Sequence, residues 1–472
     1  MTGLLLRNGE VASRPATDVR LAHGRVTEVG RSLHPAPGEE VLDLAGGAVL
    51  PGLCDSHLHL MALAAARGSV RCGPPHVGDP GQLAAALAAA SPSPDGWVRA
   101  VGYAESVAGL LDAPALDRLH GTRPVRLQHR SGAMWTVNSL GAELLGLAGA
   151  DHPGVERSLD GTPTGRLWRA DDWLRSRLPA PAPPDLGGVG DALAGLGITS
   201  VTDATPDLDD SALAILRAAV GSRALPQRVH LLGAPLESEE LGDRVTTGPY
   251  KLVLSDSALP DLDTLVARIA TVHATGRAVA VHCVTREALV LLVAALRITG
   301  ARAGDRLEHA ALVPPELVPE LAETGLRVVT QPGFLADRGD DYLADVPPAD
   351  RPDLYRCASL LGAGVPVALS SDAPYGPVDP WAVIAAAAGR RTRSGAVVGA
   401  AERIPASRAL AAYLAEPDDP GGPPRRVAPG LEDVVVLDRP LAQLLSAPEA
   451  AAVRLVVVGD RLIEPGDAQA SP

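Results

Sequence analysis

Two histidines lie two residues apart in the segment Asp55-Ser56-His57-Leu58-His59, directly after an apolar run. In a β-strand, residues i and i+2 point to the same side, so both imidazoles can face one metal ion. Two exposed histidines would give the same spacing, and the pair alone leaves that alternative open. The pair is therefore a candidate metal-binding motif that requires further ligands elsewhere in the chain.

Four more polar residues lie in other strand-like runs: Lys251 in YKLVLS, His282 in AVAVHCV, His309 in RLEHAA and Asp372 at the end of PVALSSD. Catalytic groups of a parallel barrel gather at the C-terminal ends of its strands. Several imidazoles with a carboxylate suit zinc or a similar divalent ion better than calcium or magnesium. The joint pattern predicts one metal site built by five strands.

The elements that would position these residues are eight short runs rich in β-branched residues, separated by Ala/Leu-rich segments with a helical period. The runs are 48–56, 199–204, 228–233, 250–255, 278–284, 306–311, 327–332 and 366–372. Strands alternating with helices are typical of a parallel α/β fold. We expect a (β/α)8 barrel of the TIM type.

The chain has 472 residues, whereas such a barrel needs about 250, so further pieces are expected. Both ends are rich in strand and turn signals, which predicts a small β-sandwich domain composed of 1–48 and 425–472. The barrel would then occupy 49–424, with a Pro/Gly-rich linker over 417–430. Residues 61–195 form a long insertion after the first barrel strand, and we interpret it as a cap that shapes the substrate pocket.

Composition excludes several classes of function. The net charge of −14 disfavours nucleic acid and anionic membranes as partners. The four cysteines lie far apart, which indicates neither a disulfide framework nor a thiolate metal site. No signal peptide and no apolar run long enough to span a membrane is evident, so we expect a cytoplasmic protein that acts on a small molecule.

Several segments resemble the amidohydrolase superfamily, specifically its YtcJ-like subgroup, also called amidohydrolase family 3, which includes N-substituted formamide deformylases. They are LPGLCDSHLHL, YKLVLSD, AVHCVTREAL, RLEHAAL and LSSDAPYGPVDPW. The resemblance continues into the insertion, in GWVRAVGYAES, RPVRLQHRSG and PTGRLWRADDWL, and covers nearly the whole chain. It implies the barrel fold, one or two divalent ions, zinc being expected, and a homodimer.

The resemblance also implies a role for each ligand. His57, His59 and Asp372 would bind the more buried ion, and His282 and His309 the second. Lys251 would be carboxylated on its amine and bridge the two ions, because an ammonium group repels a cation. An ordinary lysine beside a single-ion site is the alternative.

Asp372 would have a second role as the catalytic base. The ion lowers the pKa of its bound water to about 7, and the resulting hydroxide attacks the substrate carbonyl. Asp372 would accept the proton and return it to the leaving amine. A helix N-cap before Ala373-Pro374 is the alternative role for this residue.

Substrate contacts are harder to assign. Aromatic residues make up only 3% of the chain, so Tyr103 and Trp135 in the insertion, and Phe334 and Tyr375 after the seventh and eighth strands, are candidates to line a pocket. Plain packing explains each of them equally well. Related sequences often have a histidine where this chain has Ala133, so the identity of the substrate does not transfer.

These observations predict a metal-dependent hydrolase that cleaves a C–N bond in an amide, a formamide or a related carbonyl compound. A deaminase or a cyclic-amide hydrolase would use the same ligands and release different products. A binding or regulatory protein on an inactive barrel would be expected to have lost ligands, whereas all six positions are occupied here.

Overall fold

The computed structural model describes residues 3–91, 93, 95–179, 184–238, 241–256, 258–459 and 461–465. The chain divides into two compact units. The smaller is Met61–Asp185, and the larger combines Met1–Leu60 with Leu186–Pro472. Each unit is described by itself.

The larger unit contains two parallel sheets. One has the order β15 (Val245–Thr247), β14 (Arg228–Leu231), β13 (Ile198–Asp203), β6 (Leu53–Leu58). The other has the order β16 (Tyr250–Val253), β17 (Val279–Cys283), β18 (Arg306–His309), β19 (Arg327–Thr330), β20 (Val367–Leu369). Each of the eight runs expected from the sequence contains a strand of these sheets, and β15 is an additional short strand.

Backbone hydrogen bonds connect the two sheets at both of their edges. At one edge, the Lys251 amide donates to the Leu232 carbonyl at 3.0 Å. At the other, the Asp372 amide donates to the His57 carbonyl at 2.9 Å, and the His59 amide donates to the Ala373 carbonyl at 2.9 Å. The second set of bonds fixes the backbone next to three of the candidate ligands.

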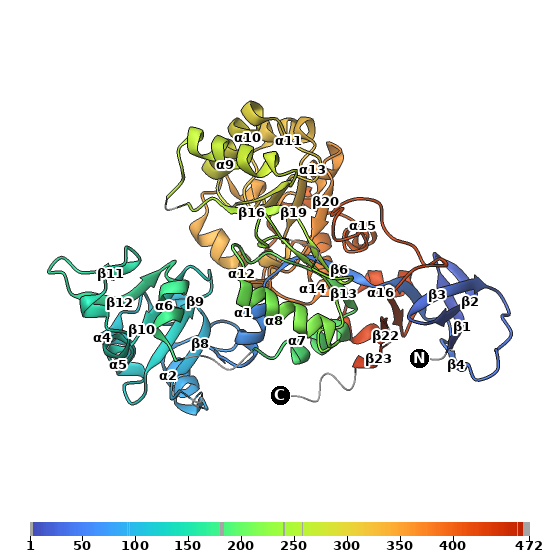
Figure 1. The fold of residues 1–472 in the computed structure, drawn as a ribbon, viewed down its shortest axis with the longest axis horizontal. Coiled ribbons are helices and arrows are strands. Elements are labelled where there is room, and N and C mark those ends of the chain that lie inside the picture. Colours follow the sequence, from blue (N-terminus) through green and yellow to red (C-terminus); the bar gives the residue numbers. More distant parts are fainter. Residues whose placement is uncertain are drawn as a thin grey trace. The chain divides into compact units, whose positions relative to one another are not determined.

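Capped amphipathic helices follow the strands, and Figure 1 shows α9, α10 and α11 beside β16 and β19. The helix α9 begins after Asp261, whose side chain accepts from the Thr264 amide at 2.8 Å, as expected of an aspartate N-cap. It buries Leu265, Ile269 and Val272, which are spaced for one helix face. The helices of this unit are α7 (Leu186–Gly195), α8 (Asp210–Gly221), α9 (Leu262–Ala274), α10 (Arg286–Thr299), α11 (Val318–Thr324), α12 (Gly333–Asp345), α13 (Ala358–Gly362), α14 (Pro380–Gly389), α15 (Ala406–Ala411) and α16 (Leu441–Ser446).

Strands from both ends of the chain form one eight-stranded sheet. Its order is β23 (Arg461–Ile463), β22 (Val453–Val458), β21 (Val434–Leu437), β5 (Ala48–Pro51), β1 (Leu4–Val11), β2 (Arg14–Ala22), β3 (Arg25–Gly30), with β4 (Glu40–Asp43) paired to β1. Leu4, Leu6, Val434 and Val457 belong to its shared buried core. The two ends of the chain therefore pair within one sheet, as expected. The description of this region as a β-sandwich stays a prediction.

The first expected barrel run is divided between two sheets. Its first half is β5 in the terminal sheet, and its second half is β6 in the parallel sheet. Gly52 separates them, and a Cβ atom there would lie 2.0 Å from Thr199 Oγ1. Only glycine permits this close approach of the backbone to Thr199 in β13.

The smaller unit is built on a six-stranded sheet in the order β11, β12, β10, β9, β8, β7. The segments GWVRAVGYAES and RPVRLQHRSG contain its strands β8 (Val98–Tyr103) and β9 (Val125–His129). The remaining strands are β7 (Val70–Arg71), β10 (Met134–Val137), β11 (Val155–Arg157) and β12 (Pro163–Trp168), and the helices from its start are α1 (Leu60–Arg67), α2 (Pro80–Ala89), α3 (Glu105–Ala108), α4 (Ala113–Leu119), α5 (Ser139–Leu145) and α6 (Asp171–Arg177). The unit ends at Asp185, ten residues before the expected end of the insertion, because α7 belongs to the larger unit.

The Pro/Gly-rich segment 417–430 lies between α15 and β21. Hydrogen bonds hold it in place, because Arg425 donates to the Gly52 carbonyl and the Gly430 amide donates to the Val26 carbonyl.

All four cysteines are free and buried, in agreement with the absence of a disulfide framework. Within the described ranges, no helix combines the length and apolar character that crossing a membrane requires.

Candidate metal centre

Three of the six predicted ligands converge on one point. His57 is in β6, His59 follows the same strand, and Asp372 follows β20. Ligand atoms of these three residues all lie within 4.8 Å of one another. His57 Nε2 is 3.6 Å from Asp372 Oδ1, and His59 Nε2 is 3.3 Å from the same oxygen. This is the spacing of atoms that can share one ion.

Two of these ligand atoms form no hydrogen bond with the described residues. His57 Nε2 and Asp372 Oδ1 are buried and have no hydrogen-bond partner among the described residues. A buried polar atom without a partner costs free energy, so native proteins rarely tolerate one without a reason. Two such atoms that face each other fit a divalent cation, which would satisfy both lone pairs.

The backbone at two predicted ligands is strained. His309 has φ of 70° and Asp372 has φ of 55°, in the left-handed region that residues other than glycine seldom adopt. Both lie at or just beyond the C-terminal ends of parallel strands. Such conformations gather at functional sites, where the surroundings hold them in place. The strain therefore supports a functional assignment of both residues.

The other three predicted ligands lie beside this group. The ring centroid of His309 is 4.7 Å from that of His57 and 4.4 Å from that of His282, and His309 Nδ1 is 3.7 Å from Asp372 Oδ2. Lys251 is buried in β16, near enough for its charge to contribute to the lowered pKa of His57 and of His309, and its Nζ has no hydrogen-bond partner in the described part of the chain. The structure thus brings all six residues into one region, and the tightest cluster holds three of them.

Burial keeps the site residues in forms that can bind a cation. It lowers the pKa of His57 and of His309 well below the usual value, so both imidazoles are neutral at pH 7 and offer a lone pair. Burial also lowers the pKa of Lys251 to about 8, against the opposing effect of the Glu308 and Asp372 carboxylates. The neutral amine, which is nearly absent for an ordinary lysine at pH 7, is therefore a minor form of about one part in ten here.

Comparison with known proteins places this site in a family. Residues 40–463 match the Amidohydrolase family, which is most of the chain. The chain belongs to the amidohydrolase family. Its relatives include the N-substituted formamide deformylase of Arthrobacter pascens, which is 26% identical over 89% of this chain and 90% of that protein. The resemblance inferred from the sequence motifs is confirmed.

Two further proteins support the assignment. The YtcJ protein of Bacillus subtilis (strain 168) is 26% identical over 80% of each chain. A metal-dependent hydrolase of Pyrococcus horikoshii superposes with a TM-score of 0.73 at 20% identity, covering 96% of this chain and 99% of the other. The latter likeness shows that this amidohydrolase has the fold of that hydrolase.

Sequence reasoning missed Glu308, a carboxylate in contact with one of the predicted ligands of this amidohydrolase. It is fully buried in β18, where one carboxylate oxygen contacts His57 Nδ1 and the other accepts from Arg306 Nε. Arg306 also donates from Nη2 to the Ser56 carbonyl at 2.7 Å. A carboxylate on Nδ1 fixes the histidine tautomer and directs the Nε2 lone pair toward the ion. Arg306 and Glu308 both lie in a run predicted to be a barrel strand, where charged side chains are rarely buried without a partner, and this is the signal that could have revealed the pair.

Replacing Glu308 with glutamine is therefore expected to weaken metal binding by about 10- to 100-fold. The amide can donate to His57 Nδ1, which would place a proton on Nε2 and block the ligand atom. Metal dissociation constants measured by competition with a chelator test this, with the exposed Glu323→Gln on α11 as the matched control. Equal affinities in the two variants would contradict the role, and the melting temperature of metal-free protein separates metal loss from unfolding.

The alternative role of Asp372 as a helix N-cap is wrong. No helix begins directly after it, because the next helix, α14, begins at Pro380. The cap of α14 is Asp379, which accepts from the Trp381 amide at 2.8 Å. Asp203, the carboxylate that ends β13, accepts from the amides of Leu60 at 2.7 Å and Thr205 at 3.0 Å. It therefore fixes the loop after His59.

The aromatic candidates divide into two groups. Tyr103 and Trp135 are buried inside the smaller unit, where Tyr103 donates to the Gly109 carbonyl at 2.5 Å and Trp135 donates to Asp171 at 2.8 Å. These contacts explain both residues as packing, and their role in substrate binding stays a prediction.

The other two aromatic residues lie in the larger unit. The ring of Tyr375 is 5.5 Å from that of His59, measured between centroids. Phe334 belongs to a buried cluster with Tyr355, against which Tyr375 also packs. Tyr375 is thus placed next to a predicted ligand, and Phe334 supports the wall behind it.

Proposed function

We propose that this amidohydrolase cleaves a C–N bond of an amide, a formamide or a related carbonyl compound, with a divalent ion held by His57, His59 and Asp372. The observation that carries the proposal is the pair of buried atoms, His57 Nε2 and Asp372 Oδ1, that face each other with no hydrogen-bond partner among the described residues. We infer further that the two parallel sheets, hydrogen-bonded at both edges, close into the expected barrel.

Nitrogen ligands favour zinc for this site. Two imidazoles and one carboxylate form the donor set of many catalytic zinc sites, which keep a fourth position open. His282 and His309 lie close enough to supply a second ion, with Lys251 as a carboxylated bridge. We propose zinc as the resident ion, and the metal content of Lys251 variants distinguishes one ion per chain from two.

The ion would supply two things, polarisation of the substrate carbonyl and acidification of a water molecule. Asp372 is the group of the chain that moves the proton: its carboxylate takes a proton from the attacking water and passes it to the leaving nitrogen. Glu308 holds the His57 tautomer during this exchange, and Arg306 balances the charge of Glu308. The chain thus provides a base, an oriented ligand and a buried counter-charge.

The surroundings of the site favour a substrate with an apolar substituent. A cluster containing Ala311, Phe334, Leu335 and Tyr355 is buried behind the ends of β18 and β19, and Tyr342 and Tyr375 pack against it. Apolar and aromatic walls with few polar groups are typical of pockets for small organic ligands. The relative from Arthrobacter pascens is named for N-substituted formamides, so we propose N-substituted formamides as the first compounds to test.

The test combines metal analysis with a substrate panel. The purified protein is expected to contain bound zinc and to release formate and a primary amine from N-substituted formamides. Release of ammonia from a compound without an acyl group would instead show a deaminase, and ring opening would show a cyclic-amide hydrolase. A metal-loaded protein that cleaves nothing across amides, formamides and cyclic amides would overturn the proposal in favour of a binding protein.

A further inference from the structure

The pairing between β6 and β13 is irregular beside the predicted ligand His57. On β13, the paired residues Val201 and Asp203 are two positions apart. Their partners on β6, Asp55 and Leu58, are three positions apart. An extra residue of this kind makes a β-bulge, which bends the strand and changes the direction of the side chains next to it. The direction of the His57 imidazole therefore depends on what holds the backbone of this bulge.

Two charged side chains hold the backbone of the bulge. The His57 amide donates to Asp55 Oδ1 at 3.2 Å. The carbonyl of Ser56, which precedes His57, accepts from Arg306 Nη2 at 2.7 Å. Buried backbone groups need partners of this kind, so both contacts stabilise the bulge. Arg306 belongs to the Glu308 contact of His57, whereas Asp55 reaches a different strand.

Asp55 bridges the seam between the two parallel sheets. The oxygen that accepts from His57, Oδ1, also accepts from the Ser371 amide at 3.2 Å. Ser371 directly precedes the predicted ligand Asp372, and its hydroxyl accepts from the Ala373 amide at 3.0 Å. One carboxylate oxygen is thus bonded both to the strand that carries His57 and to the segment that carries Asp372.

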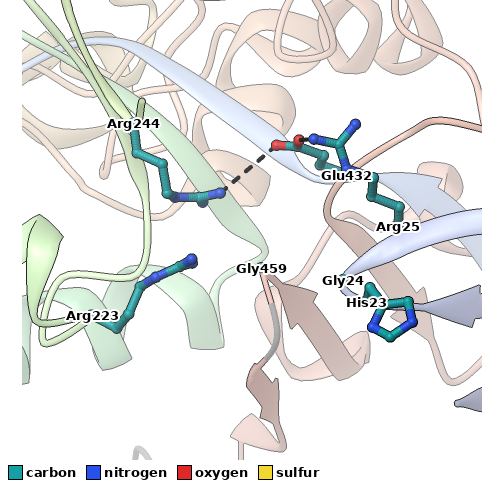
Figure 2. A pocket seen from close by; sticks show the side chains of 7 residues that line it. All are labelled: His23, Gly24, Arg25, Arg223, Arg244, Glu432 and Gly459. Atoms are coloured by element: carbon teal, nitrogen blue, oxygen red, sulfur yellow. Dashed lines mark ion pairs between the residues drawn. The ribbon is translucent and has the colours of Figure 1, made fainter. Parts of the chain in front are cut away.

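No cation explains the burial of this carboxylate. Asp55 is fully buried and forms no ion pair with an arginine or lysine of the described residues. By contrast, Glu432, which lines a cavity of about 390 Å³ in the same unit, is 2.6 Å from Arg25 Nη2 and 3.7 Å from Arg244 Nη1 (Figure 2). Burying a carboxylate costs free energy unless hydrogen bonds or a counter-charge compensate for it. The hydrogen bonds that compensate Asp55 come from the two segments that carry His57 and Asp372.

We propose that Asp55 is a positioning residue of the metal centre, which sets the separation of His57 and Asp372. It holds the bulge on one side of the seam and the Asp372 segment on the other, so that His57 Nε2 and Asp372 Oδ1 stay 3.6 Å apart. A metal site requires its ligand atoms to be held within about 0.5 Å of the productive geometry. The inference rests on the proposed function, and it assigns a role to a residue that is not itself a predicted ligand.

Zinc dissociation constants, measured by competition with a chelator, test the proposal. Asp55→Leu cannot accept a hydrogen bond and is expected to weaken zinc binding by about tenfold or more. Asp55→Asn keeps an oxygen that can accept from both amides, so its affinity should stay within about threefold of the wild-type value. The visible spectrum of the cobalt-loaded protein, which depends on ligand geometry, should change in Asp55→Leu only.

Asp18→Leu is the matched control. Asp18 is also buried and accepts from two backbone amides, those of Asn8 and Leu33, both at 2.9 Å, but it lies in the terminal sheet. Its replacement should lower the melting temperature and leave zinc binding and the cobalt spectrum unchanged. The control thus separates the loss of a buried acceptor from the loss of ligand positioning.

Two outcomes would overturn the proposal. Equal zinc affinities in the wild type, Asp55→Leu and Asp18→Leu would remove Asp55 from the site and leave the metal centre intact. Equal losses in Asp55→Asn and Asp55→Leu would show that the charge of Asp55, and not its hydrogen bonds, acts on the ion. Wild-type protein that binds no zinc would instead contradict the proposed function on which the inference rests.

Asp55→Glu provides a second variant should Asp55→Leu fail to fold. It keeps the charge but lengthens the side chain, so the carboxylate can no longer bridge the same two amides at the same separation. It is expected to weaken zinc binding by about tenfold as well. Wild-type affinity in a folded Asp55→Glu protein would also overturn the proposal.

Discussion

Replacing Asp372 with asparagine is expected to lower kcat/KM for C–N bond hydrolysis by at least about 10³-fold. The amide cannot accept the proton that the attacking water must lose. It also removes a negative charge from a site where Asp372 Oδ1 faces both His57 Nε2 and His59 Nε2. The loss should fall mainly on kcat where the metal remains bound, since proton transfer belongs to the chemical step.

Asp379→Asn is the matched control for this variant. Asp379 caps α14, seven residues after Asp372, and asparagine caps a helix about as well as aspartate. Metal content measured on both variants separates a lost ligand from a lost base. An Asp372→Asn enzyme that contains metal and keeps more than a tenth of the activity would remove Asp372 from the mechanism.

The candidate ligands were predictable because their chemistry is local. A His-x-His pair on a strand needs only the alternation of side chains, and residues at the C-terminal ends of parallel strands meet because the fold requires it. His57 and His59 satisfy the first condition, and His282, His309 and Asp372 satisfy the second. The eight strand-like runs were predictable for the same reason, since strands and helices alternate regularly along the chain.

The partners of these ligands were not predictable in the same way. Glu308 reaches His57 across 251 residues of sequence, and this contact depends on the relative positions of β6 and β18, which lie in different sheets. The backbone angle at His309 also breaks the alternation that a regular strand would impose on its neighbours. The predicted end of the insertion, at residue 195, was wrong for a similar reason. The helix α7 belongs to the larger unit, and the sequence of α7 alone does not show which unit it packs against.

The lysine content of the chain gives a further reason to assign Lys251 to the metal site. Lys251 is the single lysine of the chain, which uses arginine at all of its other basic positions. The arginine guanidinium cannot be deprotonated in proteins, whereas a buried lysine amine can be. The one lysine is buried beside His57 with its pKa lowered to about 8. A lysine at this position is what the proposed carboxylated bridge requires, because arginine could not form it.

Replacing Lys251 with alanine is expected to reduce the metal content from about two ions per chain to one or fewer, because a carboxylated amine would bridge both ions. Lys251→Arg keeps the positive charge but cannot form a carbamate, so it should lose metal as alanine does. An ordinary lysine would predict the opposite, with arginine retaining the wild-type content. Because the chain has a single lysine, protein prepared with ¹³C-bicarbonate should give one carbamate signal from a side chain by NMR, absent in both variants. One ion per chain in all three proteins, with no such signal, would leave a single-ion hydrolase in which His57, His59 and Asp372 bind the metal without a bridge.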